Sequence, residues 1–259
     1  MSEIGSGYRM VVAYDGTAYH GWQAQSGVRT VEGALILALA AATGERVRVR
    51  AAGRTDAGVH AHGQVVAFVL SRDWSPPQLL AACNSHLPED IAVLEADRAE
   101  LDFDPRRRAW RRTYRYLLAP TRVPSPIGRQ YAWRVSPQLE IEPMREAARL
   151  VVGRHDFAAF GRSSEAGGST VRTVEMAAVE SRVGLIAVEV RGDAFLRGML
   201  RNLVGALVAV GEGRLALADF AAAVAGGHRG AGSWRLAPAH GLHQWRVDYE
   251  RPLTRGAKV

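Results

Sequence analysis

The first hundred residues alternate between apolar runs of strand length and an apolar pattern of helical period. Residues 8–14 and 63–70 are such runs, and the second run is apolar on both faces, as a central strand is. Between them Val31, Leu35 and Leu39 recur every four residues, which predicts a helix from an N-cap at Thr30 to about Thr43. Residues 46–50 (RVRVR) alternate strictly, so that one face is arginine and the other valine. A second helix is predicted from Ser75 and Pro76 to about Asn84, followed by a strand over residues 91–99.

A similar succession starts again beyond residue 105. It predicts strands over residues 113–118, 171–180, 184–191 and 244–249, and helices over 142–152, 195–210 and 220–224, with Asp193 and Asp219 as caps of the last two. The sequence thus predicts two related βαββαβ-like halves, residues 1–105 and 106–259. Short turns between strands, mixed with helices, are typical of an α+β fold with a mainly antiparallel sheet.

Composition excludes several classes of protein. The chain has 259 residues, of which 47% are hydrophobic and 23% charged, so it can bury a large core. The single cysteine, Cys83, excludes a disulfide-rich secreted scaffold. No apolar run approaches the roughly 20 residues of a membrane span, and residues 1–7 lack the pattern of a signal peptide, so we expect a cytoplasmic protein.

The charge adds an expectation about partners. Thirty-three basic against 26 acidic residues give a net charge of +7, and Lys258 is the only lysine. Arginine binds phosphate through a bidentate fork, so a nucleic acid is the first partner to consider. The alternative is that arginine replaces lysine for compositional reasons alone.

One polar segment, residues 53–63, concentrates reactive side chains: Arg54, Asp56, His60 and His62. Thr-Asp-Ala-Gly is also a good turn, in which Asp56 would only bond its own backbone. The two histidines are too few for a catalytic metal site, which usually needs three ligands, so we expect no metal.

The order of the motifs identifies a family. Residues 53–66 read GRTDAGVHAHGQVV and resemble the signature of the tRNA pseudouridine synthase A family. Further segments resemble the family in the same order: YDG (14–16), GWQ (21–23), NSHLPEDI (84–91), RTYRY (112–116), HDF and F (155–160), FLRGMLRNLVG (195–205) and GL (241–242). The resemblance therefore covers nearly the whole chain.

The resemblance implies a reaction and roles for its residues. It implies that uridines at tRNA positions 38 to 40, in the anticodon stem-loop, are isomerised to pseudouridine, with no cofactor, by a homodimer. It implies one extended mixed sheet with helices on one face and a central active-site cleft. Asp56 would be the nucleophile, Arg54 would displace the target base, and Arg201 would pair with Asp56. Tyr114 would stack on the uracil and relay the proton from C5, and Leu242 would close the pocket.

Six arginines are candidates for contacts to the RNA backbone, and the alternative for all of them is a solvated charged face. They are Arg46, Arg48, Arg50, Arg106, Arg111 and Arg112.

The sequence also departs from the family pattern. Asp104 and Pro105 stand where the family usually has His-Ala, Arg107 stands where it has an aromatic residue, and Asp193 where it often has asparagine. Residues 241–245 are more polar than usual.

Two other classes of function remain open. A non-catalytic RNA-binding protein would keep the basic faces without needing Arg54, Asp56 and Tyr114 together. A nucleoside hydrolase would usually carry a pair of carboxylates, and no second acid stands out beside Asp56.

Overall fold

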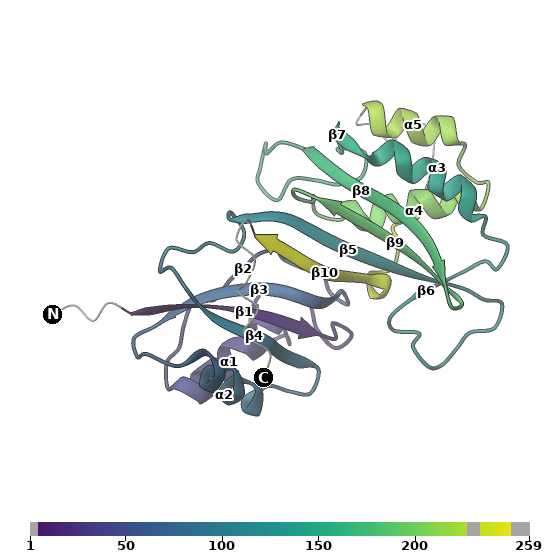
Figure 1. Cartoon of the computed structure of the whole chain (residues 1–259). Helices are drawn as coiled ribbons and strands as arrows, with labels where there is room; N and C mark the ends of the chain where they lie inside the picture. The colour runs from purple at the N-terminus through teal and green to yellow at the C-terminus, as the bar shows by residue number, and fades with distance from the viewer. Residues whose placement is uncertain (1–4, 227–233, 250–259) are drawn as a thin grey trace. The chain divides into compact units, whose positions relative to one another are not determined.

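The computed structural model describes residues 5–226 and 234–249, which fall into two compact units (Figure 1). The first comprises residues 1–110 together with 244–259, and the second comprises residues 111–243. This division differs from the expected one, because the C-terminal strand returns to the first unit rather than staying with the second half of the chain.

The first unit is a largely antiparallel sheet with two helices. Its elements are β1 (Ser6–Tyr14), α1 (Val31–Thr43), β2 (Arg50–Ala51), β3 (His60–Leu70), α2 (Pro76–His86), β4 (Ile91–Ala99) and the returning part of β10 (Leu242–Tyr249). The strands follow the order β4-β1-β3-β10, with β2 beside β3. β1 pairs antiparallel with both β3 and β4. The element order βαββαβ predicted for this half is confirmed by β1, α1, β2, β3, α2 and β4.

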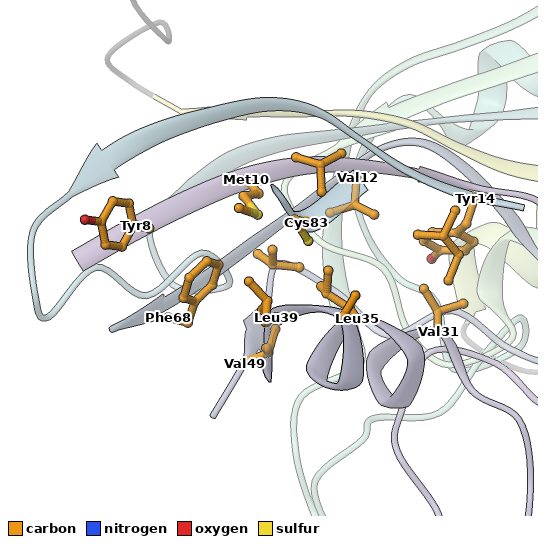
Figure 2. Packing of buried hydrophobic residues seen from close by; sticks show 14 of the residues in the cluster. Tyr8, Met10, Val12, Tyr14, Val31, Leu35, Leu39, Val49, Phe68 and Cys83 are labelled. Atoms are coloured by element: carbon orange, nitrogen blue, oxygen red, sulfur yellow. The ribbon is translucent and has the colours of Figure 1, made fainter. Parts of the chain in front are cut away.

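The core of this unit lies between the sheet and its two helices. Figure 2 shows Leu35 and Leu39 of α1 directed at the strand residues Met10 and Val12, with Cys83 of α2 among them. All five side chains are at most 1% exposed. Apolar residues four positions apart lie on one side of a helix, and this side of α1 packs on the sheet.

Local signals for α1 are confirmed. The Thr30 hydroxyl accepts a hydrogen bond from the Gly33 amide, as an N-cap does, and Gly44 ends the helix with φ +77°. The alternating residues 46–50 are mostly not a strand, since only Arg50 pairs with β3. Their valines nevertheless pack inward and Arg46 and Arg48 face solvent, as the alternation predicts.

The second unit contains β5 (Ala109–Pro120), β6 (Trp133–Val135), α3 (Ile141–Val151), β7 (Gly153–Asp156), β8 (Val171–Arg182), β9 (Leu185–Gly192), α4 (Met199–Gly211) and α5 (Leu217–Gly226). Its strands follow the order β5-β9-β8-β7, all antiparallel, with β6 parallel to β5. α3 packs against α4, α5 and β8. The α+β class with a mixed, mainly antiparallel sheet is confirmed.

Two helix starts in this unit are corrected. α4 begins at Met199 rather than near Phe195, because Gly198 adopts φ +75° and is its N-cap. Asp193 does not cap it, since its carboxylate accepts instead from the amides of Thr173 and Ala194. Asp219 does not cap α5 either, because this helix begins at Leu217 and Asp219 lies in its first turn.

Candidate active site

The loop of residues 52–59, between β2 and β3, carries Arg54 and Asp56. It is shorter than the polar segment of the sequence, because β3 begins at His60. The Val59 amide donates to the Asp56 carbonyl at 3.2 Å, and Gly58 supplies the positive φ that this turn needs. Arg54 is exposed and Asp56 is partly exposed.

The segment that follows β1 holds this loop in place. The Tyr14 hydroxyl lies 2.8 Å from the Thr55 hydroxyl in a buried hydrogen bond, and the Trp22 amide donates to the Thr55 carbonyl at 3.1 Å. The residue beside Asp56 is therefore fixed through both its side chain and its backbone.

Two glycines of this segment allow the close approach. A Cβ at Gly16 would lie 2.0 Å from the Val59 carbonyl oxygen, and one at Gly21 would lie 2.7 Å from that of Thr55. Gly21 also has φ +89°, which side chains rarely tolerate. The YDG and GWQ motifs are thus structural supports of the loop that carries Asp56.

His60 is buried and serves the same support. Its Nδ1 accepts a hydrogen bond from the Gly16 amide at 3.1 Å and lies 3.1 Å from a carboxylate oxygen of Asp15. His62, on the same strand, packs against Trp245 with ring centroids 4.3 Å apart. Among the described residues no group of three His, Cys, Asp or Glu side chains could hold a metal ion.

A buried glutamine pair, which sequence reasoning missed, anchors the other end of the loop. Gln64 Nε2 donates to the Gly53 carbonyl at 2.8 Å, and Gln244 Nε2 donates to Gln64 Oε1 at 3.2 Å. Both side chains are fully buried. Gln244 belongs to the unusually polar run at residues 241–245, and this pairing is the structural use of that polarity.

The second unit carries Tyr114 on β5. Tyr114 is opposite Val190 of β9, partly exposed, and its ring meets Phe195 edge to face at 5.4 Å. Tyr116, on the same face of the strand, is buried, and its hydroxyl donates to the Pro238 carbonyl at 2.7 Å. Burial raises the pKa of Tyr116 far above its usual value, against the opposing charges of Arg201 and Arg235, so this tyrosine is a packing residue.

Arg201 lies in the first turn of α4 and is held by a neighbouring segment. Its Nε donates to the Ala237 carbonyl at 2.8 Å, and the Ala237 amide donates to the Arg201 carbonyl at 3.1 Å. Gly205 lets this segment run along the helix, since a Cβ there would lie 2.0 Å from the Arg235 carbonyl oxygen. Arg197 precedes α4 and forms a β-bridge with Arg162.

Leu242 opens β10 and is nearly buried. The residue before it must be glycine, because a Cβ at Gly241 would lie 2.5 Å from the ring of Tyr116. The Gly-Leu pair thus depends on the second tyrosine of the RTYRY motif.

Comparison with known proteins places this set of motifs in a family. The family model of tRNA pseudouridine synthase matches residues 10–106 and 147–250. The chain belongs to the tRNA pseudouridine synthase family. A protein named tRNA pseudouridine synthase A from Methylobacterium sp. (strain 4-46) is 44% identical over 95% of this chain and 98% of its own.

Further relatives of the tRNA pseudouridine synthase family bear the same name. The one from Agrobacterium fabrum (strain C58 / ATCC 33970) is 42% identical over 93% of this chain and 92% of its own length. The one from Citrifermentans bemidjiense (strain ATCC BAA-1014 / DSM 16622 / JCM 12645 / Bem) is 39% identical over 93% of this chain and 97% of its own length. Among the described residues of this synthase-family chain, no helix has the length and apolarity that crossing a membrane requires.

The arginines expected to contact RNA in this synthase family fall into two groups. Arg46, Arg48 and Arg106 are exposed. The other three arginines are partly buried and bond other parts of the fold. Arg50 donates to the Leu101 carbonyl, Arg111 pairs with the Glu175 carboxylate, and Arg112 donates to the Asp193 carbonyl. The exposed arginines are therefore the clearer candidates for phosphate contacts.

The departures at residues 104–107 form a local turn. The Asp104 carboxylate accepts from the amides of Arg106 and Arg107, at 2.8 and 3.0 Å. Partial burial raises the pKa of Asp104, but the backbone hydrogen bonds from Arg107 and Arg106, together with the charges of Arg50 and Arg107, lower it by more, so the net pKa is lowered. The Pro105 carbonyl accepts from the Tyr249 hydroxyl of β10 at 2.8 Å, so this turn is tied to the returning strand.

Proposed function

We propose that this chain isomerises uridine to pseudouridine at positions 38 to 40 of tRNA, with Asp56 as the nucleophile. The single observation that best supports this proposal is the way in which hydrogen bonds hold the Asp56 loop in place. Tyr14 and Trp22, from two motifs outside the loop, bond the side chain and the carbonyl of Thr55, and Gln64 bonds the Gly53 carbonyl. The backbone that leads to Asp56 is thus fixed, while Asp56 stays partly exposed.

The reaction is an isomerisation and balances without a cofactor. The N1–C1′ bond of uridine breaks, the uracil turns, a C5–C1′ bond forms, and the proton on C5 leaves while N1 gains one. A covalent bond from the Asp56 carboxylate to C1′ of the ribose or to C6 of the base holds the pieces together in the meantime.

The proposal assigns the other residues by their chemistry. Arg54, exposed on the same loop, displaces the base and holds the extruded nucleotide, which a stacked uridine needs. Tyr114 stacks on the uracil and carries the C5 proton, and Leu242 supplies apolar surface. Arg201, whose guanidinium is oriented by the Ala237 carbonyl, is the cation that accompanies the Asp56 carboxylate.

The proposal also includes the partners and the compartment. The substrate is tRNA, bound through exposed arginines such as Arg46 and Arg48. The active form is a homodimer in the cytoplasm. Light scattering of the purified protein tests the dimer, and a monomer mass would contradict it.

The experiment that tests the reaction is incubation with unmodified tRNA, followed by mapping of pseudouridine along the RNA. We expect pseudouridine at positions 38 to 40 only. Free uracil in the products would identify a hydrolase instead. Tight binding of tRNA without any modified base would identify a non-catalytic RNA-binding protein.

A further inference from the structure

A pocket in the second unit shares no residue with the candidate active site. Its volume is about 270 Å³, and it lies where the end of β5, strand β6, the end of α4 and the segment before β10 meet. Its polar lining comes from Thr121, Arg122, Arg134, Ser136, Glu212 and Arg235.

The charge of this pocket is positive. Among its described lining residues the only carboxylate is that of Glu212, which is bound by Arg214, whose Nε lies 2.7 Å from the carboxylate oxygen. Within residues 5–226 and 234–249, Arg122, Arg134 and Arg235 form no ion pair with a carboxylate. Three arginines therefore line one hollow, and the Glu212 carboxylate among its lining residues already has a partner.

The fold fixes these arginines although they are far apart in sequence. Arg134 lies on β6, which pairs with β5, and its Nη1 is 3.5 Å from the Arg122 carbonyl. The Arg235 guanidinium lies over the ring of buried Trp133, 4.6 Å from its centre. The backbone of Arg235 is in turn held against α4 at Gly205.

The hydroxyl donors of the pocket are already used. Thr121 donates to the Val123 carbonyl at 2.9 Å, and Ser136 bonds the Gln138 side chain at 2.8 Å. The donors left for a ligand are those of the guanidinium groups, whose fork matches the oxygens of a phosphate.

We propose that this pocket binds one backbone phosphate of the tRNA. The inference rests on the proposed function, because it takes the phosphate from the substrate. Contacts of this type position an RNA without reading its bases, and among the described lining residues both hydroxyls are already bonded and no side chain is aromatic. The pocket would hold the tRNA at a point separate from the reacting uridine.

The first test compares two single variants in tRNA binding at several salt concentrations. Arg134→Ala removes a pocket arginine whose one bond inside the fold is the long contact to Arg122. Its control, Arg154→Ala, removes an exposed arginine of β7 outside the pocket. We expect Arg134→Ala to weaken binding about tenfold and to reduce the log–log salt slope by about one. The control should change affinity less than about twofold.

The second test locates the phosphate. A set of tRNAs, each with one phosphate replaced by a neutral methylphosphonate, is bound by the wild type and by Arg134→Ala. We expect one linkage whose neutralisation weakens the wild type but has no further effect on the variant, which is the signature of a direct pair. Additive effects at every linkage would overturn the proposal, as would equal losses for Arg134→Ala and Arg154→Ala.

A third arm separates the two sources of phosphate. Inorganic phosphate is titrated into the wild type and Arg134→Ala by calorimetry. Phosphate binding that is lost in the variant, together with unchanged tRNA binding, would assign the pocket to a free anion and overturn the RNA assignment. Pseudouridine formation by the wild type is scored separately, so a failure of the proposed function is distinguishable from a failure of the pocket.

Discussion

At the scale of single residues, chemistry and support are divided between neighbours. Asp56 and Tyr114 remain partly exposed, whereas Thr55 and Tyr116 beside them are buried and hydrogen-bonded. Each reactive side chain is thus next to a residue whose role is to hold the backbone. Substitutions at the two kinds of position should have different consequences.

Asp56→Asn should abolish turnover and leave the fold and tRNA affinity nearly unchanged. Asparagine keeps the size and the turn propensity of aspartate but cannot act as the nucleophile. The measurement is pseudouridine formation at saturating tRNA, with affinity and melting temperature as controls. A variant that kept more than a few per cent of the rate would show that Asp56 forms no covalent bond.

Tyr114→Phe should slow turnover by about 10²–10⁴-fold with little change in binding, because the ring still stacks but the hydroxyl is lost. Tyr114→Leu should in addition weaken binding by roughly 1–3 kcal/mol, the usual value of stacking on a base. The matched control is Tyr116→Phe, which should lower stability through its lost bond to Pro238 and leave the proton transfer intact. If Tyr114→Phe turned over at the wild-type rate while deprotonation limited turnover, Tyr114 would be a stacking platform alone.

At the scale of elements, the Asp56 loop depends on contacts with β1, β3 and β10. The glutamine pair provides the contact to β3 and β10. Gln64 donates to the carbonyl of Gly53, and Gln244, which is 180 residues away in the sequence, donates to Gln64. A loop fixed in this way presents its carboxylate without having to order on binding.

Gln64→Leu should cost about 1–3 kcal/mol of folding stability, because it leaves the Gly53 carbonyl and the Gln244 amide buried without partners. It should also lower kcat. Adding Gln244→Leu removes one of the two unsatisfied groups, so the double variant should regain part of the stability without regaining kcat. Denaturant unfolding and single-turnover kinetics measure the two effects. A parallel recovery of kcat would mean that the pair acts through stability only.

At the scale of the whole molecule, we expect the excess of arginine to provide the affinity for RNA. Arg48 is exposed, whereas Arg111 is paired with Glu175 at 2.7 Å, so the two should not respond alike. Arg48→Ala should reduce the salt slope of tRNA binding by about one. Arg111→Ala should change stability as well, because it releases the partner carboxylate. Affinity that did not depend on salt would assign the arginines to another role.

Metal removal should leave activity unchanged. The histidines of the loop segment have other tasks, since His60 accepts from the Gly16 amide and His62 packs on Trp245. Pseudouridine formation after chelation and gel filtration is the measurement. Activity that was lost and then restored by one particular ion would contradict the proposal that the isomerisation needs no metal.

The sequence by itself determined most of the elements and the family. Apolar periodicity and the Thr30 cap are local signals, and they located α1 correctly. At α4 the local signals predicted a start that is too early, because Gly198, with its positive φ, is the N-cap and the helix begins at Met199. The motifs named the candidate residues because their spacing along the chain is itself characteristic of the family.

Only the tertiary structure decided which distant segments meet. The return of residues 244–249 to the first unit, the bond between Gln244 and Gln64 and the pocket of Arg122, Arg134 and Arg235 each join residues far apart in the chain. The physical reason is that local patterns depend on periodicity and capping within a few residues. Strand pairing and burial of polar groups depend instead on which surfaces the folded chain brings into contact.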